Sequence, residues 1–223
     1  MKNLRHRQQH RIQSTSFDMK TDMKIKPYSK IASLYDILDL PFEHFRYKPL
    51  RAEVFEGLEG DLLDAGVGTG RNFPYYPQGS NITAIDLSPA MLKRAHRRRE
   101  KLGTAVELHQ MNVLDMDFPD NSFDAIVSTF LFCVLGAEHQ QPALAELRRL
   151  CRPNGTIRIL EYSISQKPLR RSIMKLWAPW ARLAYGAEFD RNTEQYLEAA
   201  GLRLTNKKFL YKDIIKLLAL QPI

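Results

Sequence analysis

Short apolar runs alternate with amphipathic stretches along most of the 223-residue chain. The runs are rich in Leu, Ile and Val and short enough for strands, whereas the stretches between them repeat apolar positions with helical spacing. This alternation predicts a parallel sheet that is covered by helices on both faces. The predicted strands span residues 60–66, 81–87, 104–111, 122–134 and 155–163, and the predicted helices span 48–58, 88–102 and 139–152.

The predicted helices begin and end at residues that suit helix caps. Ser88 fits the N-cap of the stretch 88–102, and Pro89 fits its first helical position. Pro49 falls in the first turn of an earlier helix, and Gly57 lies near the end of that helix. These positions therefore favour helices over buried strands.

The pattern changes after Tyr162. Residues 167–185 are predicted to form a helix that is interrupted at Pro179, and residues 193–201 a short helix. Two strand-like runs within 202–220 predict an antiparallel pair that closes one edge of the sheet. The predicted fold class is α/β, a Rossmann-like doubly wound sheet of seven strands that is mostly parallel with an antiparallel edge strand.

The composition fits one domain with a basic opening segment. A chain of 223 residues with 44% hydrophobic content can bury one core. The formal net charge is +8, but residues 1–30 hold eight Lys and Arg against two Asp, so the rest is nearly neutral. We expect residues 1–26 to be a flexible tail and residues 27–223 to be a single domain. Within that domain, 27–47 is expected to form a lid and 163–190 an insertion on the acceptor side.

Cysteine usage and hydropathy limit where the protein can work. Cys133 and Cys151 lie in apolar or helical contexts, which indicates buried thiols and a reducing compartment. The longest apolar run, 125–135, is far shorter than the roughly 20 residues that span a membrane. We expect a cytoplasmic protein, either soluble or peripheral to the inner membrane. A mitochondrial location is the alternative, if the chain is eukaryotic and its Arg-rich opening is a transit peptide.

Three glycines, Gly66, Gly68 and Gly70, lie between a predicted strand and a helical pattern. They permit a tight turn that brings the backbone close to a ligand. Their G-x-G-x-G spacing differs from the G-x-G-x-x-G of dinucleotide sites, and no Lys-Ser/Thr follows as in a P-loop. An alternative is a tight turn that binds nothing, and a misread dinucleotide loop would instead indicate an oxidoreductase.

Two acids decide which ligand suits this loop. Asp64 ends the strand before the glycines, where it would repel a phosphate and attract an ammonium or a sulfonium. Asp86 ends the next strand, 22 residues later, where nucleotide-binding units place an acid for ribose hydroxyls. The loop therefore favours a cationic nucleoside without phosphates, which describes S-adenosylmethionine.

Four stretches of the chain resemble the successive motifs of class I S-adenosylmethionine-dependent methyltransferases. They are "LLDAGVGTG", "AIDLSPAMLKRA", "FPDNSFDAIVSTFLF" and "ELRRLCRPNGTIRILEY", within a region of about residues 28–162. Within this class, the chain is similar to the ubiquinone/menaquinone C-methyltransferase group. Through "YDILDLPFEHF" and "GVGTGRNFPYYP" it is also similar to bacterial phosphatidylethanolamine N-methyltransferases. The segment "WAPWARLAYGAEFDRNTEQYLEAAGL" resembles small thiol methyltransferases of the methyltransferase-like group.

The resemblance implies a methyltransferase (EC 2.1.1) with S-adenosylmethionine as cofactor and no metal. Many relatives carry Asp where this chain has Asn112, whose amide oxygen can still accept a hydrogen bond from the adenine amino group. The implied cofactor contacts are Asp64 and Gly66 at the methionine portion, Gly68 and Gly70 in the loop, Asp86 at both ribose hydroxyls, Leu87 and Met91 at the adenine faces, Asn112 and Val113 at the adenine amino group, Thr129 and Phe130 beside the sulfonium, and Tyr28 from the lid.

Catalytic residues are harder to predict for this reaction. Methyl transfer from a sulfonium is an in-line displacement with a good leaving group, so alignment and exclusion of water supply much of the acceleration. A base is needed only where the acceptor has a proton to lose. His139 also fits a helix cap, and Tyr35 also fits a core position. The candidates are Tyr35, His139, Glu161 and Tyr162, with Tyr28 and His44 in addition.

Apolar and basic side chains after Tyr162 suggest the kind of acceptor. Residues 167–185 combine Trp177 and Trp180 with Lys and Arg, which suits a lipid–water interface. A helix packed over the sheet with a solvated basic face has the same composition. We expect an amphiphilic acceptor, a phospholipid amine or a prenylated quinone precursor, with a membrane surface as partner. A small soluble amine or thiol is the alternative. RNA is less favoured, because the basic run 93–101 lacks interleaved aromatic residues.

Overall fold

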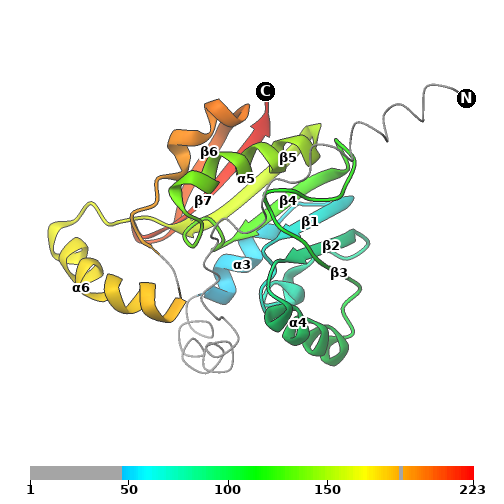
Figure 1. Cartoon of the computed structure of the whole chain (residues 1–223), viewed down its shortest axis with the longest axis horizontal. Helices are drawn as coiled ribbons and strands as arrows, with labels where there is room; N and C mark the ends of the chain where they lie inside the picture. The colour runs from blue at the N-terminus through cyan, green and yellow to red at the C-terminus, as the bar shows by residue number, and fades with distance from the viewer. Residues whose placement is uncertain (1–46, 186–187) are drawn as a thin grey trace, which may run out of the picture.

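The computed structural model describes residues 47–185 and 188–223 (Figure 1). The predicted tail 1–26 and the predicted lid, apart from Tyr47, lie outside the described residues. The candidate site residues that fall outside them are Tyr28, Tyr35 and His44.

Seven strands of the described chain form one sheet. They are β1 (Asp61–Ala65), β2 (Asn81–Asp86), β3 (Glu107–Gln110), β4 (Phe123–Thr129), β5 (Cys151–Tyr162), β6 (Leu202–Tyr211) and β7 (Ile215–Pro222). Their order is β3-β2-β1-β4-β5-β7-β6. The first five strands pair in parallel, and β7 pairs antiparallel with β5 and with β6. The predicted sheet is confirmed, and its antiparallel strand is β7, one place in from the edge.

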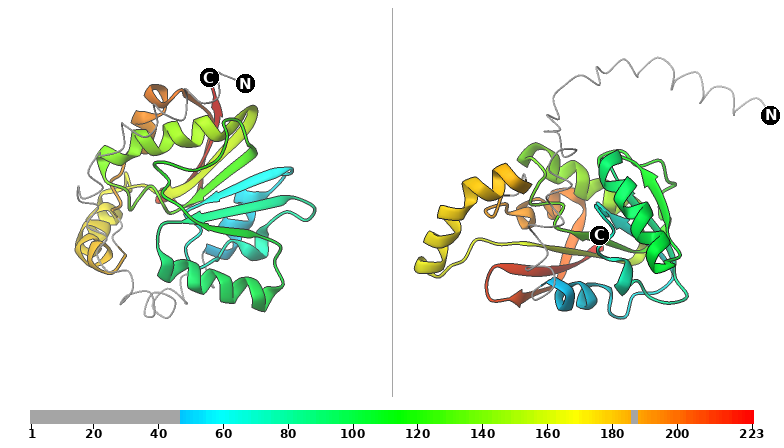
Figure 2. Two further views of the ribbon diagram at one scale, coloured as in Figure 1. Left: turned by 45° about the vertical axis from the view of Figure 1, so that its right-hand side comes forward. Right: turned by 90° about the horizontal axis from the view of Figure 1, so that it is seen from below.

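Helices cover both faces of the sheet (Figures 1 and 2). They are α3 (Lys48–Phe55), α4 (Pro89–Leu102), α5 (Ala137–Leu150) and α6 (Pro168–Tyr185), with 3₁₀ turns η2 (Phe73–Tyr75), η3 (Thr193–Tyr196) and η4 (Glu198–Ala200). α3, α4 and η2 pack on one face, and α5, η3 and η4 pack on the other. This doubly wound arrangement is the one that the alternating pattern predicts.

Two apolar clusters fill the space between the sheet and its helices. Leu63 and Ile126 belong to the cluster beneath α5, whereas their neighbours Leu62 and Val127 belong to the cluster beneath α3 and α4. Successive strand residues point to opposite faces, so one strand supplies both clusters. Each of these four side chains is at most 1% exposed. The central strands β1 and β4 therefore give firm support to the residues at their carboxyl ends.

The N-cap of α4 follows the prediction. The Ser88 hydroxyl accepts a hydrogen bond from the Met91 N–H at 3.4 Å, and Pro89 is the first helical residue. Gly103 ends the helix with a φ of +64°. Because the Ser88 and Pro89 signals are local, the sequence alone identifies the start of this helix.

Several predicted element boundaries are wrong. The predicted helix 139–152 ends at Leu150, because Cys151 and Arg152 already belong to β5, which therefore begins before the predicted residue 155. α6 continues through Pro179. Proline has no N–H to bond the carbonyl four residues earlier, but that carbonyl lies in an exposed turn of the helix, where water can bond it instead. β4 ends at Thr129 instead of running on, because Phe130 adopts a φ of +56° and leaves the strand conformation. The short helix at 193–201 is instead two 3₁₀ turns, although Gly201 ends them as expected with a φ of +71°.

The described residues also bear on the expectations about cysteines and membrane spans. Cys133 and Cys151 are both buried free thiols. Among the helices of the described residues, none combines the length and the apolar character that a membrane crossing requires.

Candidate active site

The glycine loop after β1 is held against β2 and leaves part of its backbone open. The N–H of Gly66 donates to the carbonyl of Ile85 at 3.0 Å. A Cβ on Gly70 would approach the ring of Phe73 to 2.5 Å, whereas a Cβ on Gly68 would have no atom within 4 Å. All three glycines have positive φ angles, of 83°, 55° and 78° in chain order. The packing of Phe73 therefore requires a glycine at position 70. At Gly68 the space that a side chain would fill is open, so a ligand can approach the backbone there.

Asp86 lies at the carboxyl end of β2, directly against this loop. Its Oδ2 accepts the Gly68 N–H at 2.8 Å, and its Oδ1 accepts the Ser88 N–H at 2.8 Å. Burial raises the pKa of the Asp86 carboxyl, although both backbone hydrogen bonds oppose this effect. The carboxylate can accept further bonds through its remaining lone pairs. It is thus a fixed acceptor beside the open part of the loop.

Asp64, at the end of β1, is almost completely buried with only one oxygen bonded. The residue is 1% exposed. Its Oδ2 accepts bonds from the Tyr76 hydroxyl at 2.6 Å and from Nδ2 of Asn72 at 2.8 Å. Its Oδ1 has no hydrogen-bond partner among the described residues. Burial raises the pKa of this carboxyl to about 6. A buried oxygen without a partner is costly, and a cationic ligand would satisfy it.

Three side chains that the sequence analysis missed hold Asp64 in place. Besides Asn72 and Tyr76, Arg51 of α3 is buried at 7% exposure. Its Nη1 donates to Oδ1 of Asn72 at 2.7 Å and to Oγ1 of Thr129 at 3.1 Å. Asn72 and Tyr76 come shortly after the glycine loop in the sequence. This position could have identified them as candidate site residues. Arg51 carried no such signal, because only the packing of α3 brings it to the site.

Phe130 lies at the carboxyl end of β4 in a strained conformation. Its φ is +56°, and its N–H donates to the carbonyl of Leu160 at 2.7 Å. A bulky residue in this region is uncommon and costs on the order of 1–3 kcal/mol, and such outliers gather at functional sites. The Arg51 guanidinium lies 5.5 Å from the centre of its ring. The conformation turns the ring away from the path of the strand.

Four aromatic rings, called here the aromatic cluster, surround this position: Tyr47, Phe130, Tyr162 and Phe189. The centroid of Phe130 lies 5.4 Å from that of Tyr47 and 4.9 Å from that of Tyr162. The hydroxyls of Tyr47 and Tyr162 are 2.8 Å apart and hydrogen bonded, and Phe189 packs edge-on against Tyr162 at 5.2 Å. The cluster joins the carboxyl ends of β4 and β5, and it is apolar with one polar pair.

The predicted adenine contacts come from the neighbouring strand ends. Asp86 and Gln110 are in register at the ends of β2 and β3, so Leu87 and Asn112 both follow directly beyond this edge. Oδ1 of Asn112 accepts the N–H of Leu114 at 3.0 Å. Met91 and Val113 are both buried, at 8% and 7% exposure. Leu87 and Asn112 thus lie just beyond the ends of neighbouring strands and Met91 lies in the first turn of α4, whereas Val113 packs in the core cluster beneath α5.

Glu161 lies apart from the aromatic cluster, although it precedes Tyr162. Neighbouring strand residues point to opposite faces, and Glu161 is completely buried. The Thr193 hydroxyl donates to its Oε2 at 2.7 Å, and Nζ of Lys216 lies 3.2 Å from its Oε1. Burial raises the pKa of Glu161, and the Lys216 cation opposes this effect. The arrangement resembles a structural ion pair.

His139 also lies apart from these groups. It is a half-buried residue in the first turn of α5, and its Nδ1 lies 3.4 Å from a carboxylate oxygen of Glu138. Within the described part of the chain, no group of three or more His, Cys, Asp or Glu residues is arranged so that it could bind a metal ion.

Comparison with known proteins relates this geometry to a family. A model described as a methyltransferase domain matches residues 63–159. A phosphatidylethanolamine N-methyltransferase of Cereibacter sphaeroides is 32% identical over 149 residues, which cover 65% of this chain and 72% of that protein. The chain belongs to the class I S-adenosylmethionine-dependent methyltransferases.

A further relative agrees with the assignment, and a solved structure shares the fold. A demethylmenaquinone methyltransferase of Paenarthrobacter aurescens is 27% identical over 83% of this chain and 73% of its own. Among solved structures, an Aquifex aeolicus S-adenosylmethionine-dependent methyltransferase superposes with a TM-score of 0.62 at 24% identity, over 87% of this chain and 98% of its own. The protein is therefore a methyltransferase enzyme that uses S-adenosylmethionine, and the site fits this cofactor through the unbonded Asp64 oxygen and the open backbone at Gly68.

Proposed function

We propose that this methyltransferase transfers a methyl group to an amphiphilic acceptor, a phospholipid amine or a prenylated quinone precursor. The observation that carries the proposal is the aromatic cluster, which combines a large apolar surface with one hydroxyl pair next to the residues that suit the cofactor. Rings of this kind can hold an apolar body or a cationic head group, while the hydroxyls orient a polar atom.

The cofactor would be held by the residues around the glycine loop. Asp64 would accept the ammonium of the methionine portion through its unbonded oxygen, next to Gly66. Asp86 would accept the ribose hydroxyls beside the open backbone of Gly68, in the turn that Gly70 completes. When bound, S-adenosylmethionine supplies a methyl group on a positively charged sulfur. The neutral thioether that remains after transfer is a good leaving group. The remaining residues proposed to contact the cofactor are Leu87, Met91, Asn112, Val113, Thr129, Phe130 and Tyr28.

The chain's own contribution is to align the acceptor and to exclude water. We assign Phe130 to shield the region beside the sulfonium, because the residue leaves the strand conformation at the end of β4 and its ring packs against Tyr47 and Tyr162. Tyr162 is assigned to position the nucleophilic atom of the acceptor through its hydroxyl, which Tyr47 holds at 2.8 Å. A phospholipid amine attacks as the neutral amine, whose N–H the Tyr162 hydroxyl oxygen can accept as a hydrogen bond, and the methylated ammonium then releases its extra proton to water.

The names of two relatives support a lipid-like acceptor. One is named for phosphatidylethanolamine and the other for demethylmenaquinone. Both molecules pair a reactive polar group with long apolar chains. The exposed apolar side chains of α6 also agree with an acceptor of this kind. A cytoplasmic protein that works at the surface of the inner membrane would meet either of them.

An acceptor screen tests the proposal. The full chain is incubated with methyl-labelled cofactor and three sets of acceptors: phosphatidylethanolamine in mixed micelles, a prenylated demethylated quinone in the same micelles, and soluble amines and thiols without detergent. We expect label in the micelle fraction, and about tenfold less in a Tyr162→Phe variant. Tyr196→Phe, on the opposite face of the sheet, is the matched control. Label confined to the soluble acceptors would replace the proposal by its alternative, a small amine or thiol.

A further inference from the structure

One side of α6 carries five large apolar side chains that face solvent, called here the α6 stripe. They are Leu169, Ile173, Leu176, Trp177 and Trp180, with exposed fractions of 77%, 49%, 79%, 56% and 43%. At 3.6 residues per turn, these positions fall within about 100° of the helix surface. A continuous exposed apolar stripe of this size indicates a surface that binds something.

The side of α6 next to the stripe fixes the helix to the protein. Met174 and Ala181 are buried, at 9% and 5% exposure. Arg170 forms an ion pair with Asp213 in the turn between β6 and β7, and Nε of Arg171 donates to a backbone carbonyl at 2.9 Å. These contacts hold the helix without using the stripe. Leu169, Leu176 and Trp177 each keep more than half of their surface exposed, so these parts of the stripe add little to this packing.

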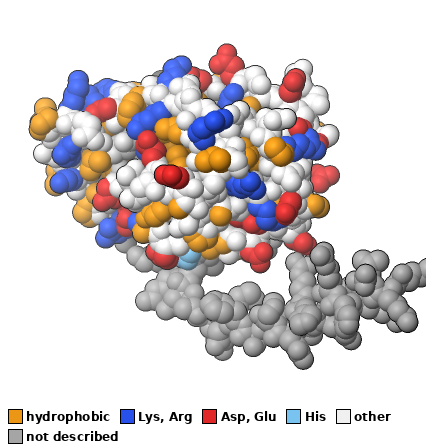
Figure 3. Space-filling view, turned by 90° about the horizontal axis from the view of Figure 1, so that it is seen from above, with side chains coloured by type: hydrophobic (Ala, Val, Ile, Leu, Met, Phe, Trp, Pro, Cys, Tyr) orange, Lys and Arg blue, Asp and Glu red, His pale blue; other side chains and the backbone are white. Residues whose placement is uncertain are grey.

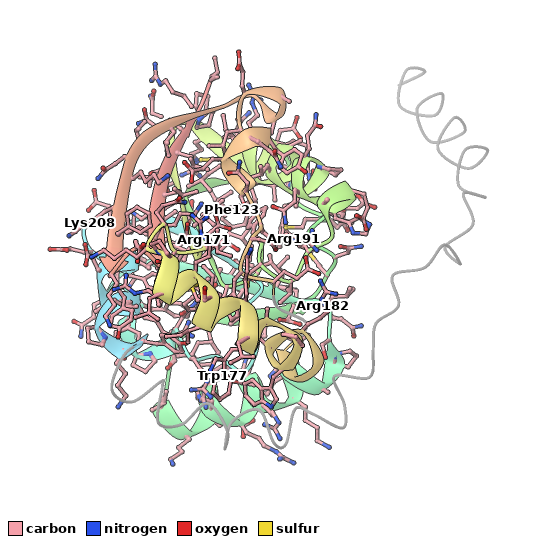
Figure 4. All side chains as sticks on the ribbon, turned by 90° about the vertical axis from the view of Figure 1, so that its left-hand side faces the viewer. Phe123, Arg171, Trp177, Arg182, Arg191 and Lys208 are labelled. Carbon is pink, nitrogen blue, oxygen red and sulfur yellow. The ribbon has the colours of Figure 1, made fainter. Side chains whose placement is uncertain are left out.

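The charges of α6 all have one sign. The helix contains Arg170, Arg171, Lys175 and Arg182 and no acidic residue. The side chain of Arg182 is 67% exposed, even though it pairs with Glu188 at 3.0 Å. Figure 3 shows hydrophobic and basic side chains next to one another at the end of the molecule where α6 projects, and Figure 4 shows Arg171, Trp177 and Arg182 along the helix. At helical spacing Arg171, Lys175 and Arg182 lie on the side of α6 away from the stripe, so the helix has an apolar side and a basic side.

Both ends of the segment that contains α6 return to the aromatic cluster. β5 ends at Tyr162 just before this segment, and Phe189 lies just after it, with the two rings 5.2 Å apart. A surface bound by the stripe would therefore lie on a segment that is anchored at the proposed acceptor site.

We propose that the α6 stripe docks on a lipid membrane whose surface carries negative charge. Tryptophans on an apolar stripe suit the interfacial region of a bilayer, and the cations of the same helix suit anionic head groups. A second copy of this chain is a poorer occupant, because it would bring two all-positive helices together. RNA is poorer too, because aliphatic side chains occupy the middle of the stripe. This inference rests on the proposed function and adds to it the surface at which the enzyme would meet its amphiphilic acceptor.

The chain supplies its own probe for this binding. Trp177 and Trp180 are the only two tryptophans in the sequence, and both lie on the stripe. The full chain, without acceptor, is titrated with vesicles of phosphatidylcholine alone or with about one quarter phosphatidylglycerol. We expect a blue shift of the tryptophan emission and co-sedimentation with the anionic vesicles, both weaker with neutral vesicles and at raised salt.

Two matched double variants test whether vesicle binding depends on the α6 stripe or on exposed apolar side chains in general. Leu169→Ser with Leu176→Ser removes two side chains from the stripe and should weaken partition into anionic vesicles by about tenfold or more. Leu102→Ser with Leu204→Ser removes two exposed leucines elsewhere, at 48% and 37% exposure, and should change it by less than about twofold. Both variants should bind adenosylhomocysteine as the natural chain does, which shows that they are folded.

Several results would overturn the inference. One is a natural chain that neither sediments with anionic vesicles nor shifts its emission. A second is equal loss of binding in both double variants. A third is a blue shift without vesicles that grows with protein concentration together with a dimeric mass in light scattering, which would assign the stripe to a second copy. Because no acceptor is used, a protein that binds vesicles but methylates only soluble acceptors would refute the proposed acceptor and retain this surface.

Discussion

Tyr76 donates a 2.6 Å hydrogen bond to Oδ2 of Asp64, while the other oxygen of the same carboxylate is buried without a partner among the described residues. Asn72 bonds the same Oδ2, so both fixed donors lie on one side of the carboxylate. The unbonded oxygen is left for a ligand. Because burial raises the pKa of Asp64 to about 6, its charge changes in a range that experiments can reach.

Cofactor affinity should therefore depend on pH through Asp64. Below about pH 6 the carboxyl is protonated and loses its attraction for a cationic ligand; above it, the carboxylate is charged. We expect the Kd of S-adenosylmethionine, measured by calorimetry, to fall between pH 5 and 7 and then to level off. Asp64→Asn should remove this dependence and weaken binding by on the order of 1–3 kcal/mol at neutral pH. A pH profile that is the same in both proteins would contradict the assignment.

Asp64→Asn should weaken cofactor binding but should make the protein without cofactor more stable. The folded pKa of about 6 lies above the unfolded value of 3.8, so the stabilisation that protonated Asp64 provides is complete below about pH 4 and is lost as the pH rises to 6. A shift of this size corresponds to roughly 3 kcal/mol. Without cofactor, Asp64→Asn should raise the free energy of unfolding in urea by up to this amount at pH 8 and by little at pH 4. A loss of stability at pH 8 would contradict the prediction.

Two glycines of the loop should respond differently to alanine. In Gly70→Ala the new Cβ would meet the Phe73 ring at 2.5 Å with φ at +78°, so we expect a loss of about 2–4 kcal/mol of unfolding free energy. In Gly68→Ala the Cβ meets nothing within 4 Å, so only about 1–2 kcal/mol of backbone strain is expected. Cofactor affinity should nevertheless fall in Gly68→Ala. Urea unfolding and calorimetry on both variants check this, and equal effects on stability would refute it.

The acid at the end of β2 should contribute to cofactor binding through two routes. Asp86→Ala removes the proposed acceptor for the ribose hydroxyls and also releases the Gly68 and Ser88 N–H groups. We expect the Kd of adenosylhomocysteine, measured by calorimetry, to rise by the equivalent of about 1–3 kcal/mol. Asp61→Asn, at the amino end of β1, is a control that should leave the Kd unchanged. No loss in Asp86→Ala would show that the ribose assignment is wrong.

Local patterns account for the parts of the site that the sequence predicts. Asp64 and the glycines are consecutive in one strand and one turn, so their chemistry can be recognised without the fold. Arg51 reaches Asn72 only because α3 packs beside η2 on one face of the sheet. Lys216 likewise meets Glu161 through the antiparallel register of β5 with β7, between residues 55 apart in the chain. A pattern of apolar positions predicts that such strands exist but does not determine which of their residues face each other.

The register that pairs Glu161 with Lys216 predicts that this acid acts on stability rather than on chemistry. Glu161→Gln keeps an acceptor for Thr193 but removes the charge beside a Lys216 that is only 3% exposed, although Glu194 still pairs with that lysine at 2.6 Å. We expect a loss of about 1–3 kcal/mol of unfolding free energy. The kcat at saturating cofactor and acceptor should change by less than about twofold, whereas Tyr162→Phe should lower kcat about tenfold and leave stability nearly unchanged. Measured together by urea unfolding and labelled methyl transfer, the reverse pattern would make Glu161 the catalytic residue and Tyr162 part of the packing. The two neighbours on β5 can differ in this way because one side chain enters the core beneath η3 and the other enters the aromatic cluster.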